Sequence, residues 1–300
     1  MTWKSRERTL KRNKWRYLSM TAGFFLLVAP FAFLFQAFNA LAGSDIPADI
    51  HSICYRVPLA WITGPGPLLV DLYIATIIIL FIIFVAFLFG PIFCGWMCPV
   101  GGMSEAISRS TPLPDNARMR VKETRVTASL RYGFFVGFIV VAVAIGQQAI
   151  AYQYGGVTCR YCASYLLETG SSLVFTGSIA IEQPMNAGLI LAVISWLVIG
   201  GIMMVGGRGW CLFFCPLGAL SGLAHKVGTK VGLYHIEFKT EKCVKCKRCQ
   251  TRCPVWAIGE DHKVEPALCI GCRECTKSCV GTAYSYKWGR TNVRDDKTKD

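Results

Sequence analysis

Four long apolar stretches constrain this 300-residue chain more than any other feature of its sequence. They run from about residue 17 to 42, 69 to 93, 132 to 152 and 187 to 207, and the last two contain no charged residue. A helix needs about 20 apolar residues to cross the roughly 30 Å of hydrocarbon in a bilayer. The composition, 53% hydrophobic and 17% charged, agrees with this class of protein. The sequence therefore predicts four transmembrane helices.

The first stretch also resembles a signal peptide, because it has a basic start and ends in Ala40-Leu41-Ala42. Its apolar part is longer than the core of about 7 to 15 residues of an ordinary signal sequence. We therefore expect an uncleaved helix that contains Pro30.

Lysine and arginine are distributed unevenly among the connecting segments. The first sixteen residues and the loop after the second stretch are basic. By contrast, the loop 43 to 68 has Arg56 as its single Lys or Arg, and the loop 153 to 186 has Arg160. The positive-inside rule predicts that both termini, the middle loop and the C-terminal segment from about residue 229 lie in the cytoplasm. The net charge of +14 is then a topology signal and does not indicate nucleic-acid binding, because no separate basic domain exists.

Eight of the fifteen cysteines form two copies of the spacing C-x-x-C-x-x-C-x-x-x-C near the C-terminus. This run is typical of bacterial ferredoxins with two [4Fe-4S] clusters, in which the fourth cysteine of each run binds the other cluster. The two predicted ligand sets are Cys243, Cys246, Cys249 and Cys279, and Cys269, Cys272, Cys275 and Cys253. Zinc or disulfides are the alternative, but zinc sites do not require a third cysteine at this spacing. Pro254 follows the first run as in the motif, whereas Val280 replaces the second proline.

A second cysteine motif occurs after the second and fourth apolar stretches. The segments 93 to 104 and 210 to 221 both read aromatic, Cys, three residues, Cys-Pro, and then share glycine and serine at the same offsets. The repeat predicts two helical hairpins related by an approximate twofold axis normal to the membrane. Residues i and i+4 share a helix face, so each pair presents two thiols, and the proline ends or kinks the helix. The four thiols are Cys94, Cys98, Cys211 and Cys215.

Three roles remain open for these four cysteines. They can bind a shared metal or cluster, cycle between dithiol and disulfide, or pack as small apolar residues. Cys54, Cys159 and Cys162 lie on the opposite side of the membrane in this topology. That compartment tolerates disulfides, so a structural bridge is one prediction and a ligand or redox role for Cys159 and Cys162 is the other.

These features predict four segments of the chain. They are a basic tail at 1–16, a four-helix transmembrane domain at 17–228, a small α+β ferredoxin-like domain at 229–287, and a polar tail at 288–300. The fold class is therefore all-α transmembrane with a two-cluster ferredoxin segment attached. Lys245, Lys247, Arg248, Arg252 and Arg273 surround the cluster ligands and either dock an acidic partner or solvate the surface.

The doubled C-x-x-x-C-P joined to the doubled ferredoxin run resembles the membrane ferredoxin-type proteins NapH and MauN over about residues 10 to 285. The resemblance implies a bacterial inner-membrane protein that oxidises quinol and passes electrons to a partner, such as a periplasmic ferredoxin or reductase or a cytoplasmic carrier. Related NosR-like and CcoG-like proteins imply the alternative of redox supply for metalloenzyme maturation. A purely structural anchor is a third reading, but an anchor does not need eight cluster ligands.

A quinol site needs an apolar slot, a hydrogen-bonding pair and a proton acceptor near a cluster. Titratable residues near the predicted interfaces are Asp71, Glu105, Glu168, His51 and His225. The sequence does not choose among them, and a charge in mid-membrane would be costly.

Overall fold

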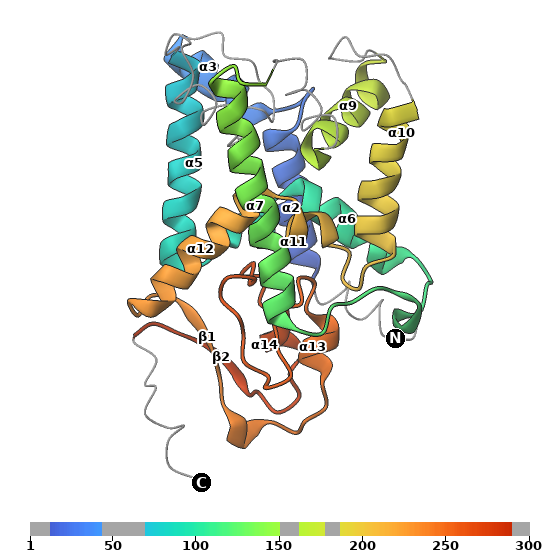
Figure 1. The fold of residues 1–300 in the computed structure, drawn as a ribbon, viewed down its shortest axis with the longest axis vertical. Coiled ribbons are helices and arrows are strands. Elements are labelled where there is room, and N and C mark those ends of the chain that lie inside the picture. The colour runs from blue at the N-terminus through green and yellow to red at the C-terminus, as the bar shows by residue number, and fades with distance from the viewer. Residues whose placement is uncertain (1–12, 44–69, 151–161, 178–186, 290–300) are drawn as a thin grey trace.

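The computed structural model describes residues 13–43, 70–150, 162–177 and 187–289. Cys54, Cys159, His51 and the basic residues before Asn13 therefore lie outside the described residues. Helices fill the upper part of the view in Figure 1, and a small part with a two-stranded sheet lies beneath them. The predicted ferredoxin cysteines all belong to this lower part.

The helices follow the predicted repeat of two halves. The first half contains α2 (Lys14–Leu27), α3 (Phe33–Ala42), α5 (Val70–Phe89), η2 (Phe93–Met97), α6 (Pro99–Ser110) and the short η3 (Asp115–Ala117). The second half contains α7 (Thr124–Gly146), α9 (Ala163–Thr176), α10 (Ala187–Val193), η4 (Ile194–Ile202), α11 (Gly209–Phe213) and α12 (Pro216–Lys230). Both η2 and η4 are π-helical, a rare form that is frequent at functional sites.

The first apolar stretch is not one continuous helix, contrary to the prediction. Helix α2 ends at Leu27 and α3 begins at Phe33, with Pro30 between them. Proline lacks an N–H and clashes with the preceding turn, which explains the break. Helix α9 was also not predicted, and its C-terminus is set by Gly177 at φ 67°, a left-handed conformation that favours glycine.

Packing between the two halves is reciprocal. Helix α6 of the first half packs against η4 of the second, while α12 of the second half packs against α5 of the first. In each half the first helix also packs against its own cysteine segment, α2 against η2 and α7 against α11. This exchange of equivalent elements is what an approximate twofold repeat requires.

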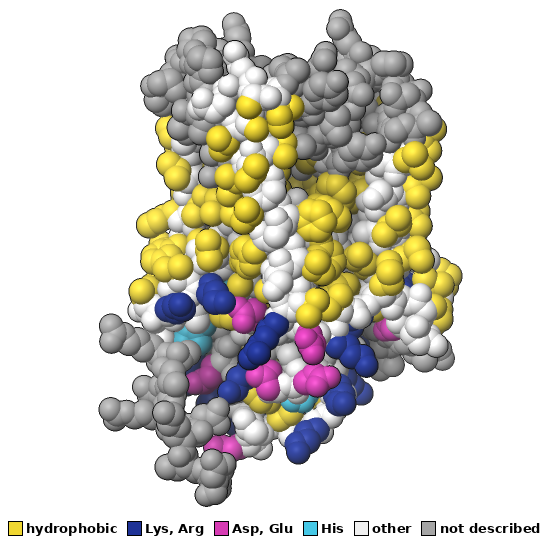
Figure 2. All heavy atoms as spheres, in the orientation of Figure 1, with side chains coloured by type: hydrophobic (Ala, Val, Ile, Leu, Met, Phe, Trp, Pro, Cys, Tyr) yellow, Lys and Arg dark blue, Asp and Glu magenta, His cyan; other side chains and the backbone are white. Residues whose placement is uncertain are grey.

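The upper part has an apolar surface. Side chains such as Ile77 and Phe81 on α5, Val140 on α7 and Leu191 on α10 are more than half exposed. Figure 2 shows yellow apolar side chains over the upper helices and charged side chains gathered around the lower part. Helix α7 is long and apolar enough to cross a membrane, and 76–89 and 190–202 are shorter apolar helices. An exposed apolar belt of this kind fits a lipid environment.

The ferredoxin-like part consists of two short copies of one unit. Strands β1 (His235–Phe238) and β2 (Tyr284–Lys287) pair antiparallel, with His235 opposite Lys287. Helices α13 (Arg248–Arg252) and α14 (Glu274–Ser278) occupy equivalent places in the two cysteine runs, and η5 (Thr240–Lys242) precedes the first run. Positive φ angles recur at matching positions, at Lys245 and Gly271, Lys247 and Arg273, and Trp256 and Thr282. The two runs therefore fold alike.

The ferredoxin-like part shares a core with the membrane part. Cys94, Leu212 and Phe213 pack in the same buried cluster as Cys269 and Cys272. The indole of Trp256 donates a hydrogen bond of 2.8 Å to the backbone oxygen of Val205, and Trp96 donates one of 3.2 Å to Gly271. The two parts are therefore joined rigidly at the cysteine motifs.

Candidate functional site

Backbone N–H groups point at ferredoxin cysteine sulfurs in a repeated pattern. Lys245 and Gly271 donate to Cys243 and Cys269 at 3.4 and 3.5 Å. Ala257 and Ala283 donate to Cys253 and Cys279 at 3.3 and 3.2 Å. Hydrogen bonds to sulfur are one of the means by which proteins stabilise and tune iron–sulfur clusters. The residues present therefore fit two clusters.

The fourth cysteine of each run lies near the other run. Burial raises the pKa of the Cys253 thiol to about 11, and the charge of Cys272 in the second run acts in the same direction. Cys253 likewise interacts with Cys269 and Cys275, whereas Cys249 interacts with Cys279. The crossed ligand assignment requires this proximity.

The two cluster sites differ in their distance from the membrane part. Cys269, Cys272, Cys275 and Cys253 are all buried, whereas Cys246 is exposed and Cys243 is half-buried. A Cβ atom on Gly95, beside Cys94, would lie 2.3 Å from the backbone oxygen of Ile270 and 3.2 Å from the amide of Cys272. The second ligand set is thus the membrane-proximal one, and the first faces outward.

The C-x-x-x-C-P motifs have a shared local geometry that differs from the prediction. Cys94 lies in the π-helix η2 and Cys211 in α11, but Cys98 and Cys215 are the N-caps of new helices that begin at Pro99 and Pro216. Each pair therefore does not share one helix face. Proline is favoured at the first helical position because it has no N–H to leave unpaired. It starts the following helix rather than only ending the preceding one.

The four membrane cysteines come together from the two halves. Cys94 interacts electrostatically with Cys98 and Cys215, and Cys211 with Cys98. The amide of Gly218 donates to the Cys215 sulfur at 3.4 Å, as in the ferredoxin-like part. Among the described residues, no three Cys, His, Asp or Glu side chains lie close enough to hold a single metal ion, and this includes the ferredoxin cysteines. The donor set itself, four thiols with an amide that donates to one sulfur, has the chemistry of an iron–sulfur cluster site.

Cys162 lies beside this set, and the predicted separation from it is wrong. The residue is the N-cap of α9, and it packs with Cys98 against the buried cluster of Val100, Ala163 and Trp196. Cys215 interacts electrostatically with Cys162. Helix α9 buries Leu166 and Leu167, and this packing holds its N-terminus near the motifs. The predicted bridge to Cys54 or a role for Cys159 stays a prediction, because both lie outside the described residues.

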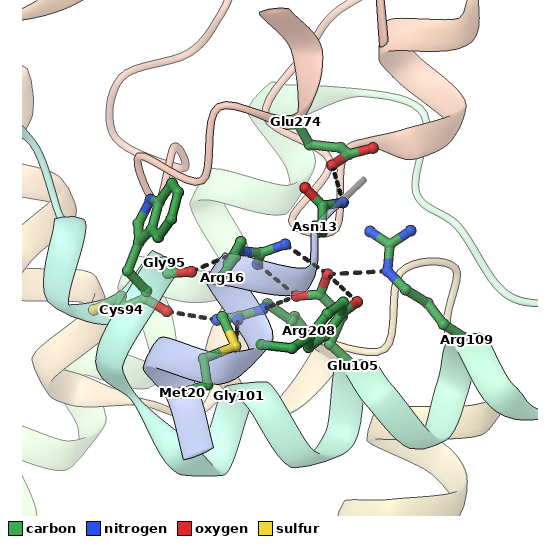
Figure 3. A network of polar contacts seen from close by, with 12 residues as sticks. Asn13, Arg16, Met20, Cys94, Gly95, Gly101, Glu105, Arg109, Arg208 and Glu274 are labelled. Carbon is green, nitrogen blue, oxygen red and sulfur yellow. Dashed lines mark hydrogen bonds and ion pairs between the residues drawn. The ribbon is translucent and has the colours of Figure 1, made fainter. Parts of the chain in front are cut away.

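A buried ion network surrounds the first motif (Figure 3). The Glu105 carboxylate accepts hydrogen bonds from Arg16 at 2.6 and 2.8 Å, from Arg208 at 2.6 Å and from Arg109 at 3.0 Å. Arg16 also donates to the backbone oxygen of Gly95 at 2.7 Å, and Arg208 to that of Cys94 at 2.6 Å. The network thereby holds α2, α6 and the segment before α11 against the cysteine motif.

Glu105 is ionised in this setting. Burial alone would raise the pKa of its carboxyl group, but the charges of Arg16, Arg208 and Arg109 hold the pKa well below its ordinary value. Glu105 is therefore a structural anion and not the proton acceptor that a quinol site needs. In the sequence, Arg16 and Arg109 belong to the basic segments that indicate membrane topology. The sequence signal that was missed is Arg208, a cation directly before a C-x-x-x-C-P motif.

Two other predicted titratable residues are also buried. Glu168 is 2% exposed on α9, and His225 is 2% exposed on α12. Burial lowers the pKa of His225 to about 4, and the nearby His235 adds to this effect. The ring lies against Gly90 and Tyr234, and its Nδ1 atom has no hydrogen-bond partner in the described part of the chain. The imidazole is therefore neutral and its free Nδ1 atom can take part in a hydrogen bond, but the lowered pKa makes it a weak proton acceptor.

The 4Fe-4S binding domain family matches the chain twice, at residues 72–117 and 189–234. Each match contains one C-x-x-x-C-P motif. The two matches begin as many residues apart as the two motifs do, which confirms the internal repeat. The family description therefore applies to the membrane cysteine segments as well as fitting the ferredoxin-like part. No solved structure matches the chain.

Several curated proteins are similar over most of the chain. The putative electron transport protein YccM of Escherichia coli is 24% identical over 68% of the chain and 53% of its own length. The ferredoxin-type protein NapH of Haemophilus influenzae is 22% identical over 68% of the chain and 65% of its length. The methylamine utilization ferredoxin-type protein MauN of Methylorubrum extorquens is 26% identical over 69% of the chain and 59% of its length. The matched segments thus span between half and two thirds of these relatives.

The relatives, the repeated 4Fe-4S domain and the apolar belt agree with one another. The chain is similar to the ferredoxin-type proteins NapH and MauN, and these findings together support a membrane-associated iron–sulfur electron-transfer protein.

Proposed function

We propose that the protein oxidises membrane quinol and delivers the electrons to a partner redox protein. The observation that carries the proposal is the direct contact between the membrane cysteine motif and the membrane-proximal ferredoxin cysteines. Gly95 leaves room for the backbone of Ile270 and Cys272, and Cys94 lies in the same buried core as Cys269. Redox groups held by these two cysteine sets would therefore lie next to one another.

Three thiol sets would hold the cofactors in a line. The membrane set is Cys94, Cys98, Cys211 and Cys215, the proximal set is Cys269, Cys272, Cys275 and Cys253, and the distal set is Cys243, Cys246, Cys249 and Cys279. Iron–sulfur clusters, when bound, supply one-electron oxidation and reduction. The proximal set and Cys94 are buried, the other three membrane cysteines are half-buried, and the exposure of Cys246 gives an exit at the surface.

Quinol oxidation releases two electrons and two protons, so a donor site requires a proton acceptor as well as an electron acceptor. His225 supplies a buried hydrogen-bonding group for such a site, since its Nδ1 atom has no partner among the described residues and its ring lies at the end of α5. Tyr234 stands beside it with ring centroids 6.2 Å apart, and the Tyr234 ring also lies near Cys269 and Cys275. The pair combines hydrogen-bonding capacity with proximity to the second ligand set.

The partner is expected at the exposed distal set. Lys245, Lys247 and Arg248 are exposed around Cys246, and they favour a partner with an acidic surface. Arg273 is engaged differently, since its guanidinium stacks 4.7 Å from the Tyr286 ring centroid. We propose that the chain crosses a bacterial inner membrane four times and that this face lies on the cytoplasmic side. The basic residues that flank the apolar stretches support this topology.

The function is tested by anaerobic mixing of the purified protein with a reduced quinol analogue while the visible absorption of the clusters is followed. We expect bleaching of the clusters in the wild type and loss of at least about 90% of the rate in Cys94→Ser and Cys215→Ser, one tenfold step being about 1.4 kcal/mol of barrier. Reduction by dithionite serves as the control for assembled clusters. Equal quinol-driven rates in all three proteins would show that electrons do not enter through the membrane set.

A further inference from the structure

Arg131 on α7 is a buried cation that has no carboxylate partner among the described residues. Its side chain is 2% exposed, its Nη1 atom donates a hydrogen bond of 3.0 Å to the backbone oxygen of Ala267, and its Nε atom has no partner in the described residues. Glu265, two residues before Ala267, pairs instead with Lys226 at 3.3 Å. Burying an unpaired charge is costly, so a compensating anion is expected nearby.

The repeat shows which anion Arg131 lacks. Arg16 stands on the first helix of the first half and pairs with Glu105, the residue after Ser104. Arg131 stands on the first helix of the second half, and the residue after the equivalent Ser221 is Gly222. A Cβ atom on Gly222 would lie 3.5 Å from Nη1 of Arg131 and 2.2 Å from the Ala267 oxygen, so no side chain fits there. The second half keeps the arginine and omits the carboxylate.

The groups around Arg131 are thiols of two different sets. Its charge acts on Cys94 and Cys215 of the membrane set and on Cys269 of the proximal set. Its Nη2 atom lies 3.0 Å from the position of a Cβ atom on Gly218, the residue whose amide donates to the Cys215 sulfur. The hydrogen bond to Ala267 fixes the guanidinium two residues before Cys269. Arg131 therefore lies between the two sets.

We infer that Arg131 is the shared counter-charge of the cofactors held by the membrane and proximal cysteines, and that it raises the reduction potentials of both. An added electron makes a thiolate-ligated cluster more negative, and a fixed cation in a dry site stabilises the reduced form more than the oxidised form. Arg131 is a positioning residue that acts through the ligands and does not touch substrate. The inference rests on the cofactor sites of the proposed function, but not on the identity of the electron donor.

The test is a redox titration of the whole purified protein with dithionite and mediators, followed by electron paramagnetic resonance. Arg131→Gln removes the charge and keeps a polar side chain, so we expect the membrane and proximal clusters to titrate at more negative potentials with unchanged iron content. The distal cluster should shift less, because its site is exposed and solvent there weakens the effect of the Arg131 charge. Arg125→Gln, an exposed arginine on the same helix, is the matched control and should shift nothing.

Wild-type potentials in Arg131→Gln, with all iron retained, would overturn the inference. If that variant loses iron, Arg131→His decides, since imidazole is also polar and is charged only at lower pH. Its potentials should fall more steeply than those of the wild type between about pH 5 and about pH 8. Identical pH profiles would also overturn the inference. Failure of quinol to reduce the wild type would instead contradict the proposed donor and leave this titration unaffected.

Discussion

Glu105→Gln should abolish the stable folded membrane part, the largest effect expected of any single substitution in this chain. The change keeps the shape of the side chain but leaves Arg16, Arg208 and Arg109 without their anion in a fully buried site. Removing one partner of a buried ion pair costs about 3–5 kcal/mol, and here three cations share the lost partner. Thermal unfolding in detergent, followed by tryptophan fluorescence, measures the loss.

Glu237→Gln is the matched control for this substitution. Glu237 pairs with Lys287 at 2.8 Å, but that pair lies on the surface, where an ion pair contributes about 0–1 kcal/mol. Because the pKa of Glu105 is depressed, its contribution is present above the ordinary carboxyl range and is lost only as the pH falls through the depressed value. A Glu105→Gln protein with the unfolding temperature of the Glu237→Gln control would contradict the structural role of the network.

Gly95→Val should separate the ferredoxin-like part from the membrane cysteines. Even the Cβ atom would stand 2.3 Å from the Ile270 oxygen, and the obstacle is backbone, which cannot rotate away. Overpacking a tight contact typically costs about 1–3 kcal/mol, and relief requires the Cys269–Cys272 loop to move away from Cys94. We expect quinol-driven reduction of the ferredoxin clusters to fall at least about tenfold, while dithionite still reduces them.

Gly137→Val on α7 is the control, because a Cβ atom at that glycine meets nothing within 4 Å. It should keep both the unfolding temperature and the quinol-driven rate of the wild type. If Gly95→Val behaves like Gly137→Val, the contact between the motif and the proximal cysteines is not the route of electrons.

Repeated motifs, regular cysteine spacing and long apolar stretches could be interpreted from the sequence alone. The doubled C-x-x-x-C-P motif predicted the repeat, since identical local chemistry at identical offsets requires equivalent places in two similar halves. The two ferredoxin runs were equally informative, because cluster ligation fixes their spacing. The long apolar stretches predicted α5 closely and predicted the existence of α7, which begins and ends earlier than expected, at Thr124 and Gly146, whereas Pro30 broke the first stretch into α2 and α3.

Features that depend on tertiary contacts were not predictable. Arg16 and Arg109 carry charge in a basic region, and nothing local distinguishes them from solvated topology residues until Glu105 and Arg208 meet them in space. Cys162 follows a loop assigned to the far side, and only the packing of α9 against Val100 and Trp196 brings it to Cys98. The sequence gives no sign that Arg131 lacks a carboxylate until Gly222 is compared with Glu105, which follows the equivalent serine in the first half.

The most direct test of the central claim, that the membrane cysteines form a third cofactor site beside the two ferredoxin clusters, is iron and acid-labile sulfide analysis of the anaerobically purified chain. The account predicts more than about eight of each per wild-type chain, and about eight in Cys98→Ser/Cys215→Ser, since each ferredoxin cube holds about four. Equal contents of about eight in both proteins would contradict the third site.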